Sequence, residues 1–207
     1  MSGPARFDTR LLLSGAAAAV ISSMIAGYAF SQTAPDKLAA PESFAAISDT
    51  NARSAAIFTE LGKVLMHPRC INCHPATDRP RQGDQGRLHQ PPVTRGADGH
   101  GTPALRCSNC HKDANFEPGR VPGHPEWHLA PRDMGWEGKT ISEICLQIKD
   151  KARNGNREVE ELVAHIGKDT LVGWAWAPGA GRTPPPGSQR EAGALVQGWV
   201  NTGAVCP

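Results

Sequence analysis

Two short segments of the chain carry the residues that could do chemistry. Residues 70–74 read Cys-Ile-Asn-Cys-His, and residues 107–111 read Cys-Ser-Asn-Cys-His. The pattern Cys-x-x-Cys-His attaches a c-type haem, since two intervening residues let both sulfurs form thioether bonds at one edge of the porphyrin. The histidine that follows directly is then held under the iron as its proximal ligand. The predicted haem-binding residues are Cys70, Cys73, His74, Cys107, Cys110 and His111, with His74 and His111 as the proximal iron ligands.

Two other uses of these cysteines are a zinc site and a pair of short disulfides. Residues 74–106 separate the two cysteine pairs, which is 33 residues, whereas zinc ribbons usually have about 15–20. Neither alternative explains why a histidine directly follows both pairs. The sequence therefore favours two covalently bound haem c groups, which would bring two iron atoms to the protein.

The remaining two cysteines are Cys145 and Cys206. No histidine follows either of them and they belong to no close pair, so the sequence predicts no third attached haem. In an oxidising compartment we expect them to form a disulfide, which would tie a helix to the carboxy-terminal tail. The alternative is two free or intermolecular thiols.

Each haem iron has one more axial position, which a second side chain can fill. His128 is the first candidate because apolar residues flank it, which suits a haem pocket. Met134 lies in a loop just before an expected helix, and His89 precedes two prolines on a rigid segment between the motifs. These three are the candidate distal iron ligands, and His67 and His165 follow them. The alternative for any one of them is a side chain that faces solvent.

Basic and aromatic residues near the motifs have two interpretations as well. Arg69, Arg106 and Lys112 could pair with haem propionates, or they could be solvated surface residues. Four tryptophans could pack on haem faces and edges, or they could be ordinary core residues. These are Trp127, Trp136, Trp174 and Trp176.

The first 31 residues are typical of a targeting segment. Two arginines precede residues 11–30, which carry no charge, and small residues stand at positions 29 and 31. This is the pattern of a signal peptide that is cleaved on export, so we expect residues 1–31 to be removed and the protein to be periplasmic. The alternative is a retained anchor at the inner membrane, since 20 uncharged residues could just span a bilayer.

Composition sets limits on the rest of the chain. It has 207 residues, of which 22 are Gly and 18 are Pro, and only 5 Phe, 5 Trp and 1 Tyr are available for a core. A formal net charge of +2 without a basic block excludes nucleic-acid binding through bulk basicity. One apolar stretch excludes a multi-span membrane protein. Two haems would replace the missing aromatic residues, and we expect the chain without haem not to be compact.

The expected elements are helices joined by long loops. Residues 32–48 are rich in Ala, Pro and Ser and indicate a linker, so the dihaem domain is expected at 49–207. A helix is predicted from Asp49 or Thr50 up to Pro68, where apolar residues recur at helical spacing. Residues 75–138 keep neither a helical nor a strand period, and a loop of that length must be pinned by something.

Order returns with a capping-box pattern at Thr140 and Glu143. The helix that begins there is expected to end at residues 154–155, and a shorter helix follows with apolar positions between 159 and 166. A last helix is predicted from Ser188 to about Gly203, after a Gly/Pro-rich loop. We expect no strand.

The chain resembles dihaem c-type cytochromes through its two Cys-x-x-Cys-His motifs. More narrowly, it resembles small exported cytochrome subunits of molybdenum hydroxylases of the isoquinoline oxidoreductase type. The narrower resemblance lies in the segments His-Pro-Arg at 67–69, Trp-His-Leu-Ala-Pro at 127–131, Trp-Glu-Gly-Lys at 136–139 and Trp-Ala-Trp-Ala-Pro-Gly at 174–179. It covers about residues 60–207. The sequence departs from ordinary monohaem cytochromes c in the long loop between its motifs.

The resemblance implies a mainly α, small cytochrome c-like domain whose long irregular Pro/Gly-rich loops wrap around two covalently attached haems. It implies an electron carrier rather than an enzyme, since no catalytic constellation is present. Expected partners are redox proteins, namely a periplasmic dehydrogenase, another cytochrome or a terminal oxidase. Two alternatives stay open. One is a peroxidase-like or gas-binding haem enzyme with one open iron position, and the other is a haem-containing sensor or assembly subunit.

Overall fold

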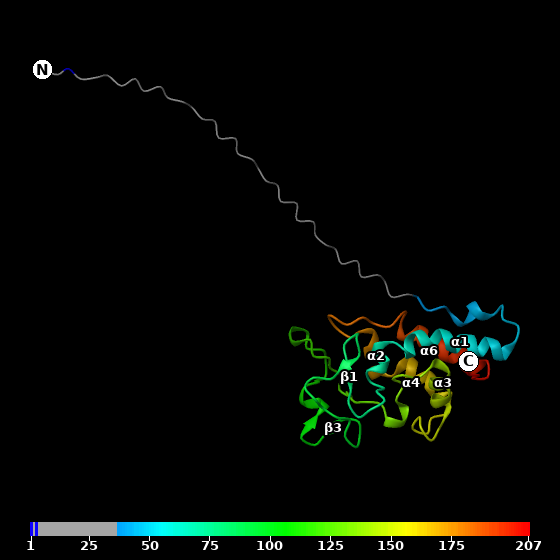
Figure 1. The fold of residues 1–207 in the computed structure, drawn as a ribbon. Coiled ribbons are helices and arrows are strands. Elements are labelled where there is room, and N and C mark those ends of the chain that lie inside the picture. The colour runs from blue at the N-terminus through cyan, green and yellow to red at the C-terminus, as the bar shows by residue number, and fades with distance from the viewer. Residues whose placement is uncertain (2, 4–36) are drawn as a thin grey trace. The chain divides into compact units, whose positions relative to one another are not determined.

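The computed structural model describes residues 1, 3 and 37–207 (Figure 1). The predicted signal peptide, or retained anchor, at 1–31 therefore lies almost wholly outside the described residues, as does the first part of the predicted linker at 32–48. Among the described residues, no helix is long and apolar enough to cross a membrane. The described residues from 37 on belong to one compact unit.

Four helices build the apolar core of this unit: α1 (Thr50–Leu65), α3 (Ile141–Lys149), α4 (Glu161–Lys168) and α6 (Gln189–Asn201). Helix α6 packs against both α1 and α4 (Figure 1). The approach of α4 to α6 is close because glycines face each other there. A Cβ on Gly167 would lie 3.0 Å from the Cα of Gly193, which leaves almost no room for a side chain. The mainly helical character that the sequence predicts is confirmed.

The helices begin where the sequence predicts. Asp49 caps α1 by accepting a hydrogen bond of 2.6 Å from the backbone N–H of Ala52. The capping box of α3 is complete, because the Thr140 hydroxyl accepts from the Glu143 N–H and the Glu143 carboxylate accepts from the Thr140 N–H. Each contact satisfies a backbone donor that has no partner inside the helix. At α6, the Ser188 hydroxyl accepts from the Glu191 N–H at 3.3 Å.

The ends of the helices differ from the prediction by a few residues. Helix α3 ends at Lys149 rather than at 154–155, because the Asn154 side chain folds back and donates to the carbonyl of Ile148 at 2.7 Å. Helix α6 ends at Asn201, two residues before the expected glycine. Three short helical segments accompany the four core helices: α2 (Pro68–Ile71), α5 (Thr170–Gly173) and the 3₁₀ helix η5 (Trp174–Trp176). Together these elements form the helical side of the unit.

The described part of the predicted linker packs against the helices. Its 3₁₀ helix, η1 (Pro41–Phe44), contacts α1 and α6. Leu38 is 7% exposed and joins the core, and the backbone N–H of Ala39 donates to the Glu60 carboxylate at 2.9 Å. The ordered unit therefore includes residues from 37 on.

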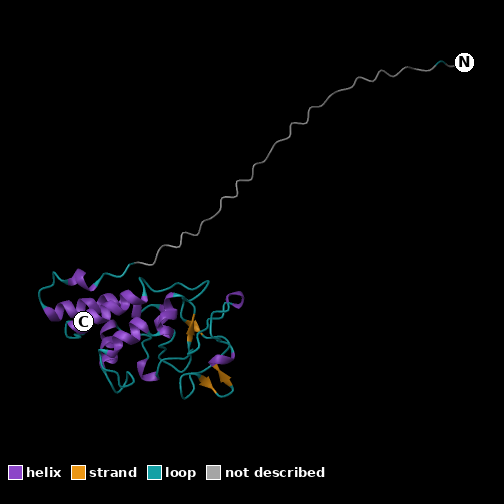
Figure 2. Ribbon diagram, turned by 180° about the vertical axis from the view of Figure 1, so that it is seen from behind, coloured by secondary structure: helices purple, strands orange, loops and turns teal. Residues whose placement is uncertain are grey.

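The segment 75–138 forms the other side of the unit, where loops and strands gather away from the helices (Figure 2). The sequence predicts no strand, but two short antiparallel hairpins are present here. They pair β1 (Arg81–Gln82) with β2 (Arg87–Leu88), and β3 (Gly101–Thr102) with β4 (Leu105–Arg106). Strands of two residues are too short to produce an alternating pattern, which is why the sequence does not reveal them. Three 3₁₀ helices follow: η2 (Cys107–Asn109), η3 (Glu117–Gly119) and η4 (Arg132–Met134).

A buried arginine ties this irregular segment together. Arg95 is 6% exposed, and its guanidinium donates to the backbone carbonyls of Ala130, Thr77 and Pro75. Its Nε lies 3.7 Å from the carboxylate of Asp78. One side chain thus joins the beginning of the long loop to its end, and this supplies part of the pinning that a loop of such length requires.

The predicted disulfide is confirmed. Cys145 on α3 is bonded to Cys206 in the carboxy-terminal tail, with an S–S distance of 2.03 Å. Lys149 on the same helix donates to the carbonyl of Ala204 at 2.7 Å. The backbone N–H of Val205 donates to the Ser54 hydroxyl at 3.0 Å, and its carbonyl accepts from Trp199 Nε1 at 2.9 Å. The tail is therefore fixed to the helical core by the disulfide and by several hydrogen bonds.

Candidate functional site

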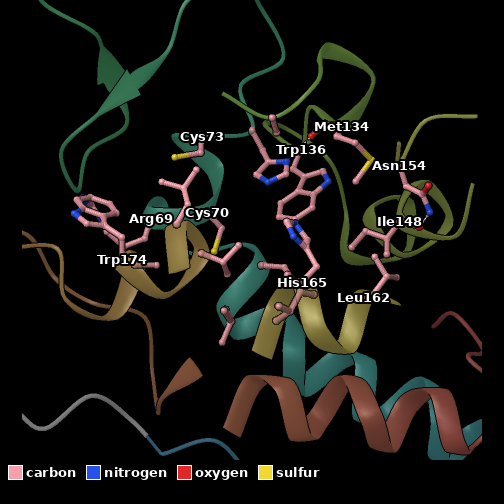
Figure 3. A pocket seen from close by; sticks show the side chains of 18 of the residues that line it. Arg69, Cys70, Cys73, Met134, Trp136, Ile148, Asn154, Leu162, His165 and Trp174 are labelled. Atoms are coloured by element: carbon pink, nitrogen blue, oxygen red, sulfur yellow. Dashed lines mark hydrogen bonds between the residues drawn. The ribbon is translucent and has the colours of Figure 1, made fainter. Parts of the chain in front are cut away.

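The first Cys-x-x-Cys-His motif lies on the helical side of the unit. It begins on the four-residue helix α2 and faces a cavity of about 170 Å³ that Cys70, Cys73 and His74 line. The other walls come from the helices α1, α3, α4 and α5 and from residues outside these helices, which include Met134 and Trp136. In Figure 3, Cys70 and Cys73 lie on one side of this cavity, and Trp136 and Met134 lie on the other. Both thiols of the motif are thus placed at the wall of a mainly apolar space.

The imidazole of His74 is held in a defined orientation. Its Nδ1 lies 2.7 Å from the carbonyl oxygen of Met134. Because a carbonyl oxygen only accepts hydrogen bonds, Nδ1 carries the proton and Nε2 is left free. Burial lowers the pKa of His74 to about 4, so the ring is neutral at neutral pH. Trp136 stacks on one ring face, with centroids 3.5 Å apart and planes 7° from parallel.

The second motif lies among the loops and meets a larger cavity. Cys107, Cys110 and His111 line a space of about 510 Å³ next to the two hairpins. Nδ1 of His111 lies 2.7 Å from the carbonyl oxygen of Pro122, so this ring also keeps Nε2 free. Burial lowers the pKa of His111, which favours its neutral form. Trp127 stacks on the ring at 4.7 Å and 16°.

The two motifs therefore repeat one set of contacts in different surroundings. In each, a backbone carbonyl binds Nδ1 of the histidine and a tryptophan covers one face of its ring. A histidine that ligates a metal almost always donates its other ring N–H in this way, which fixes the ring and raises its basicity. Both histidines are consequently prepared to bind a metal through Nε2.

The four motif cysteines are all free thiols, unlike Cys145 and Cys206. The alternative of two short disulfides is thus not what the structure contains. Burial raises the pKa of Cys70 to about 12 and that of Cys73 to about 11, whereas Cys110 is exposed. A structural zinc site needs four ligands arranged around one point. Within 37–207, no three His, Cys, Asp or Glu side chains are grouped in a way that could hold a metal ion.

The candidate distal ligands lie in three different positions. His89 lines the larger cavity, and the centroid of its ring is 5.9 Å from that of His111. His128 is half-buried and lines both cavities, with its Nδ1 2.5 Å from the carbonyl of Glu126. Met134 lines the smaller cavity, but its own carbonyl binds Nδ1 of His74. The backbone of Met134 therefore lies behind that ring, on the side away from Nε2.

The two histidines with lower priority also differ in their placement. His165 projects from α4 into the smaller cavity toward Trp136 (Figure 3), and burial lowers its pKa. His67 lines neither cavity. It caps α2, where its Nδ1 accepts a hydrogen bond of 3.2 Å from the N–H of Arg69. The structure thus brings His165 near the first motif and gives His67 a local structural role.

The two cavities share a wall. Arg69, Cys73, His128 and Trp174 line both of them. The Arg69 side chain is 2% exposed and its guanidinium lies 2.6 Å from the carboxylate of Asp84. Trp174 meets Trp127 edge to face, at 4.8 Å and 89°. Whatever fills one cavity will consequently lie next to whatever fills the other.

Arginines gather around the larger cavity, and only two of them, Arg69 and Arg106, are expected from the sequence to lie near a haem. No Asp, Glu or Lys is present among the described residues that line this cavity. The arginines come from five separate segments of the chain, so no run of basic residues marks them in the sequence. They are Arg69, Arg81, Arg87, Arg106, Arg120 and Arg182.

These residues fit a covalently attached haem c at each motif. Each motif offers two free thiols and one neutral imidazole whose Nε2 is free. Several buried polar atoms on the cavity walls also find no hydrogen-bond partner within the described chain, namely Trp136 Nε1, Arg69 Nε and Asn72 Oδ1. A buried polar atom without a partner is costly, and the propionate oxygens of a haem are acceptors that could satisfy the two N–H donors.

Comparison with known proteins gives no further assignment. The chain matches no family model, no curated protein and no solved structure. Its functional interpretation therefore depends on its own residues and on the geometry described above.

Proposed function

We propose that this protein is an exported dihaem c-type cytochrome that transfers single electrons between redox partners. The observation that carries the proposal is the contact set that both motif histidines share. A carbonyl at 2.7 Å from Nδ1, a tryptophan on the ring face and two free thiols recur at both sites. This recurrence across a helical and a loop-built environment supports a common ligand at the two motifs.

The residues of each site have separate roles in this proposal. Cys70 and Cys73, like Cys107 and Cys110 at the second site, would each add an S–H group across a haem vinyl bond. The addition forms one C–S bond, moves one proton to carbon and loses no atom. Bound haem would supply an iron that gains and loses one electron. The protein holds the imidazoles in orientation, covers them with Trp136 and Trp127, and lines the first cavity mainly with apolar surface.

Location and partners follow from the same proposal. The disulfide between Cys145 and Cys206 is compatible with an oxidising compartment such as the periplasm. The electron donor would be a periplasmic dehydrogenase, of which this chain would be a subunit or the acceptor. The electron acceptor would be another cytochrome or a terminal oxidase. Residues 1–31 would direct export and, if retained, would hold the protein at the membrane.

The mass of the purified protein tests the haem content. The full-length gene is expressed in a bacterium that attaches c-type haems, and the protein is analysed by intact mass and by haem staining after denaturing electrophoresis. Because attachment loses no atom, we expect the chain mass plus two complete haems, and plus one in C107A/C110A. The same spectrum shows whether residues 1–31 are removed. A stable folded protein that carries zinc or no cofactor would contradict the proposal.

A further inference from the structure

The rings of two histidines lie close together in the larger cavity, and only one of them belongs to a haem-attachment motif. The ring centroids of His89 and His111 are 5.9 Å apart, and their planes meet at 63°. We propose that His89 is the second axial ligand of the haem iron that His111 binds, so that the second site is bis-histidine. This inference rests on the proposed function.

The separation of the rings suits a metal between them. An imidazole–metal bond is about 2 Å long, and a ring centroid lies roughly 1 Å behind its nitrogen. Two imidazoles on opposite sides of one metal ion therefore have centroids on the order of 6 Å apart. In His89, Nδ1 lies 2.9 Å from the carbonyl oxygen of Pro91 and must donate to it. His89 and His111 thus both keep Nε2 available.

Hydrogen bonds fix the backbone around His89, although it lies in a loop. Its N–H donates to the carbonyl of Pro80 at 3.0 Å, and its own carbonyl accepts from the Arg79 guanidinium at 3.3 Å. The next residue, Gln90, donates through its N–H to the Gln82 side chain at 3.0 Å. These contacts anchor His89 to the hairpin of β1 and β2, at the wall opposite the second motif.

The other described side chains that could bind iron are less well placed for this site. His128 also lines the larger cavity, but it lies on the wall shared with the smaller one, and its ring is tilted by 30° against that of His100, with centroids 4.9 Å apart. Neither Met66 nor Met134 lines the larger cavity. The second iron would consequently have two imidazole ligands and a lower potential than an iron with one methionine ligand.

Replacing His89 tests this assignment directly. The variants are His89→Ala and, as a matched control, His124→Ala, which removes a half-buried histidine that lines neither cavity. Each holoprotein is measured by electron paramagnetic resonance, near-infrared magnetic circular dichroism and carbon monoxide titration of the reduced form. We expect His89→Ala to contain one additional high-spin haem and to bind one more equivalent of carbon monoxide than the wild type. Added imidazole should restore the low-spin spectrum, and His124→Ala should match the wild type.

The outcomes separate the two levels of the proposal. If both haems attach and His89→Ala keeps the wild-type spectrum and carbon monoxide stoichiometry, the assignment is wrong and the cytochrome proposal stands. If the wild type carries no haem, the cytochrome proposal itself is wrong. Should His89→Ala fail to accumulate, His89→Met keeps a side chain that can bind iron. It should convert the near-infrared signal of one haem from the bis-histidine to the histidine–methionine type and raise one potential, whereas an unchanged signal would overturn the assignment.

Discussion

The two sides of the unit hold the same motif on different supports. The first Cys-x-x-Cys-His segment packs against the apolar core that the helices form. The second is surrounded by 3₁₀ helices, loops and hairpins whose strands have two residues each. Both nevertheless hold their histidine by a carbonyl at 2.7 Å from Nδ1. The local contacts that prepare an imidazole for a metal therefore do not depend on a helical scaffold.

The difference in core content decides what each side needs for stability. On the helical side, Phe58, Ile57 and Trp199 are 0–2% exposed, and full burial of each such side chain contributes about 1.5–3 kcal/mol. Within residues 75–138, the buried large apolar side chains are Leu129, Met134 and Trp136, and the last two join the core of the helical side. The shortage of core residues that the composition predicts is thus concentrated in residues 75–138, the loop side of the unit. We now expect the loss of compactness without haem to be confined to that side.

Removing the second attachment site should have the largest effect. In C107A/C110A, we expect complete loss of one haem and rapid trypsin cleavage within residues 80–125, while fragments that contain α1 and α6 resist. The reason is that this side has almost no apolar core to replace the haem. In C70A/C73A, one haem is also lost, but cleavage in the helical side should stay slow. Equal protection of both sides in both variants would contradict the comparison.

Removing the disulfide should affect stability without affecting haem. Cys145 and Cys206 are 61 positions apart, and a cross-link that closes a loop of this length stabilises the folded state by about 4 kcal/mol in the chain-entropy model. We expect C145A/C206A to lose on the order of 2–4 kcal/mol in urea unfolding followed by tryptophan fluorescence. Its visible spectrum should match the wild type, since neither cysteine lines a cavity. A changed spectrum with unchanged stability would place the disulfide in the haem environment instead.

What the sequence could reveal depended on the range of each interaction. Helix starts were predictable because a cap such as Asp49 or Thr140 acts within three residues of itself. The role of Arg95 was not, since the three carbonyls that it binds are 18 to 35 positions away. The sequence identified Met134 by its side chain, whereas its backbone carbonyl makes the contact with His74. A carbonyl is common to every residue, so no sequence pattern distinguishes the one that binds a given imidazole.

The smallest effect that we expect is a difference in thiol reactivity between the two motifs of the haem-free chain. Burial raises the pKa of Cys70 to about 12 and that of Cys73 to about 11, and only the thiolate reacts with iodoacetamide. A pKa raised in the folded chain keeps the unreactive thiol form up to a higher pH. From the thiolate fractions at pH 8, we expect Cys73 to react about two-hundredfold and Cys70 about two-thousandfold more slowly than a peptide thiol, which titrates near 8.5.

Peptide mapping after alkylation, by mass spectrometry, follows each cysteine separately. Modification of Cys110, which is exposed, should come first. The rate at Cys70 and Cys73 should rise about tenfold per pH unit between pH 8 and 10, because the thiolate fraction grows in that proportion below the pKa. The reaction rate of a peptide thiol levels off above its pKa. The rates of Cys70 and Cys73 should therefore approach the rate of a peptide thiol as the pH rises. If the rates of Cys70 and Cys73 relative to a peptide thiol did not change with pH, limited access of the reagent, and not a raised pKa, would explain their slow reaction.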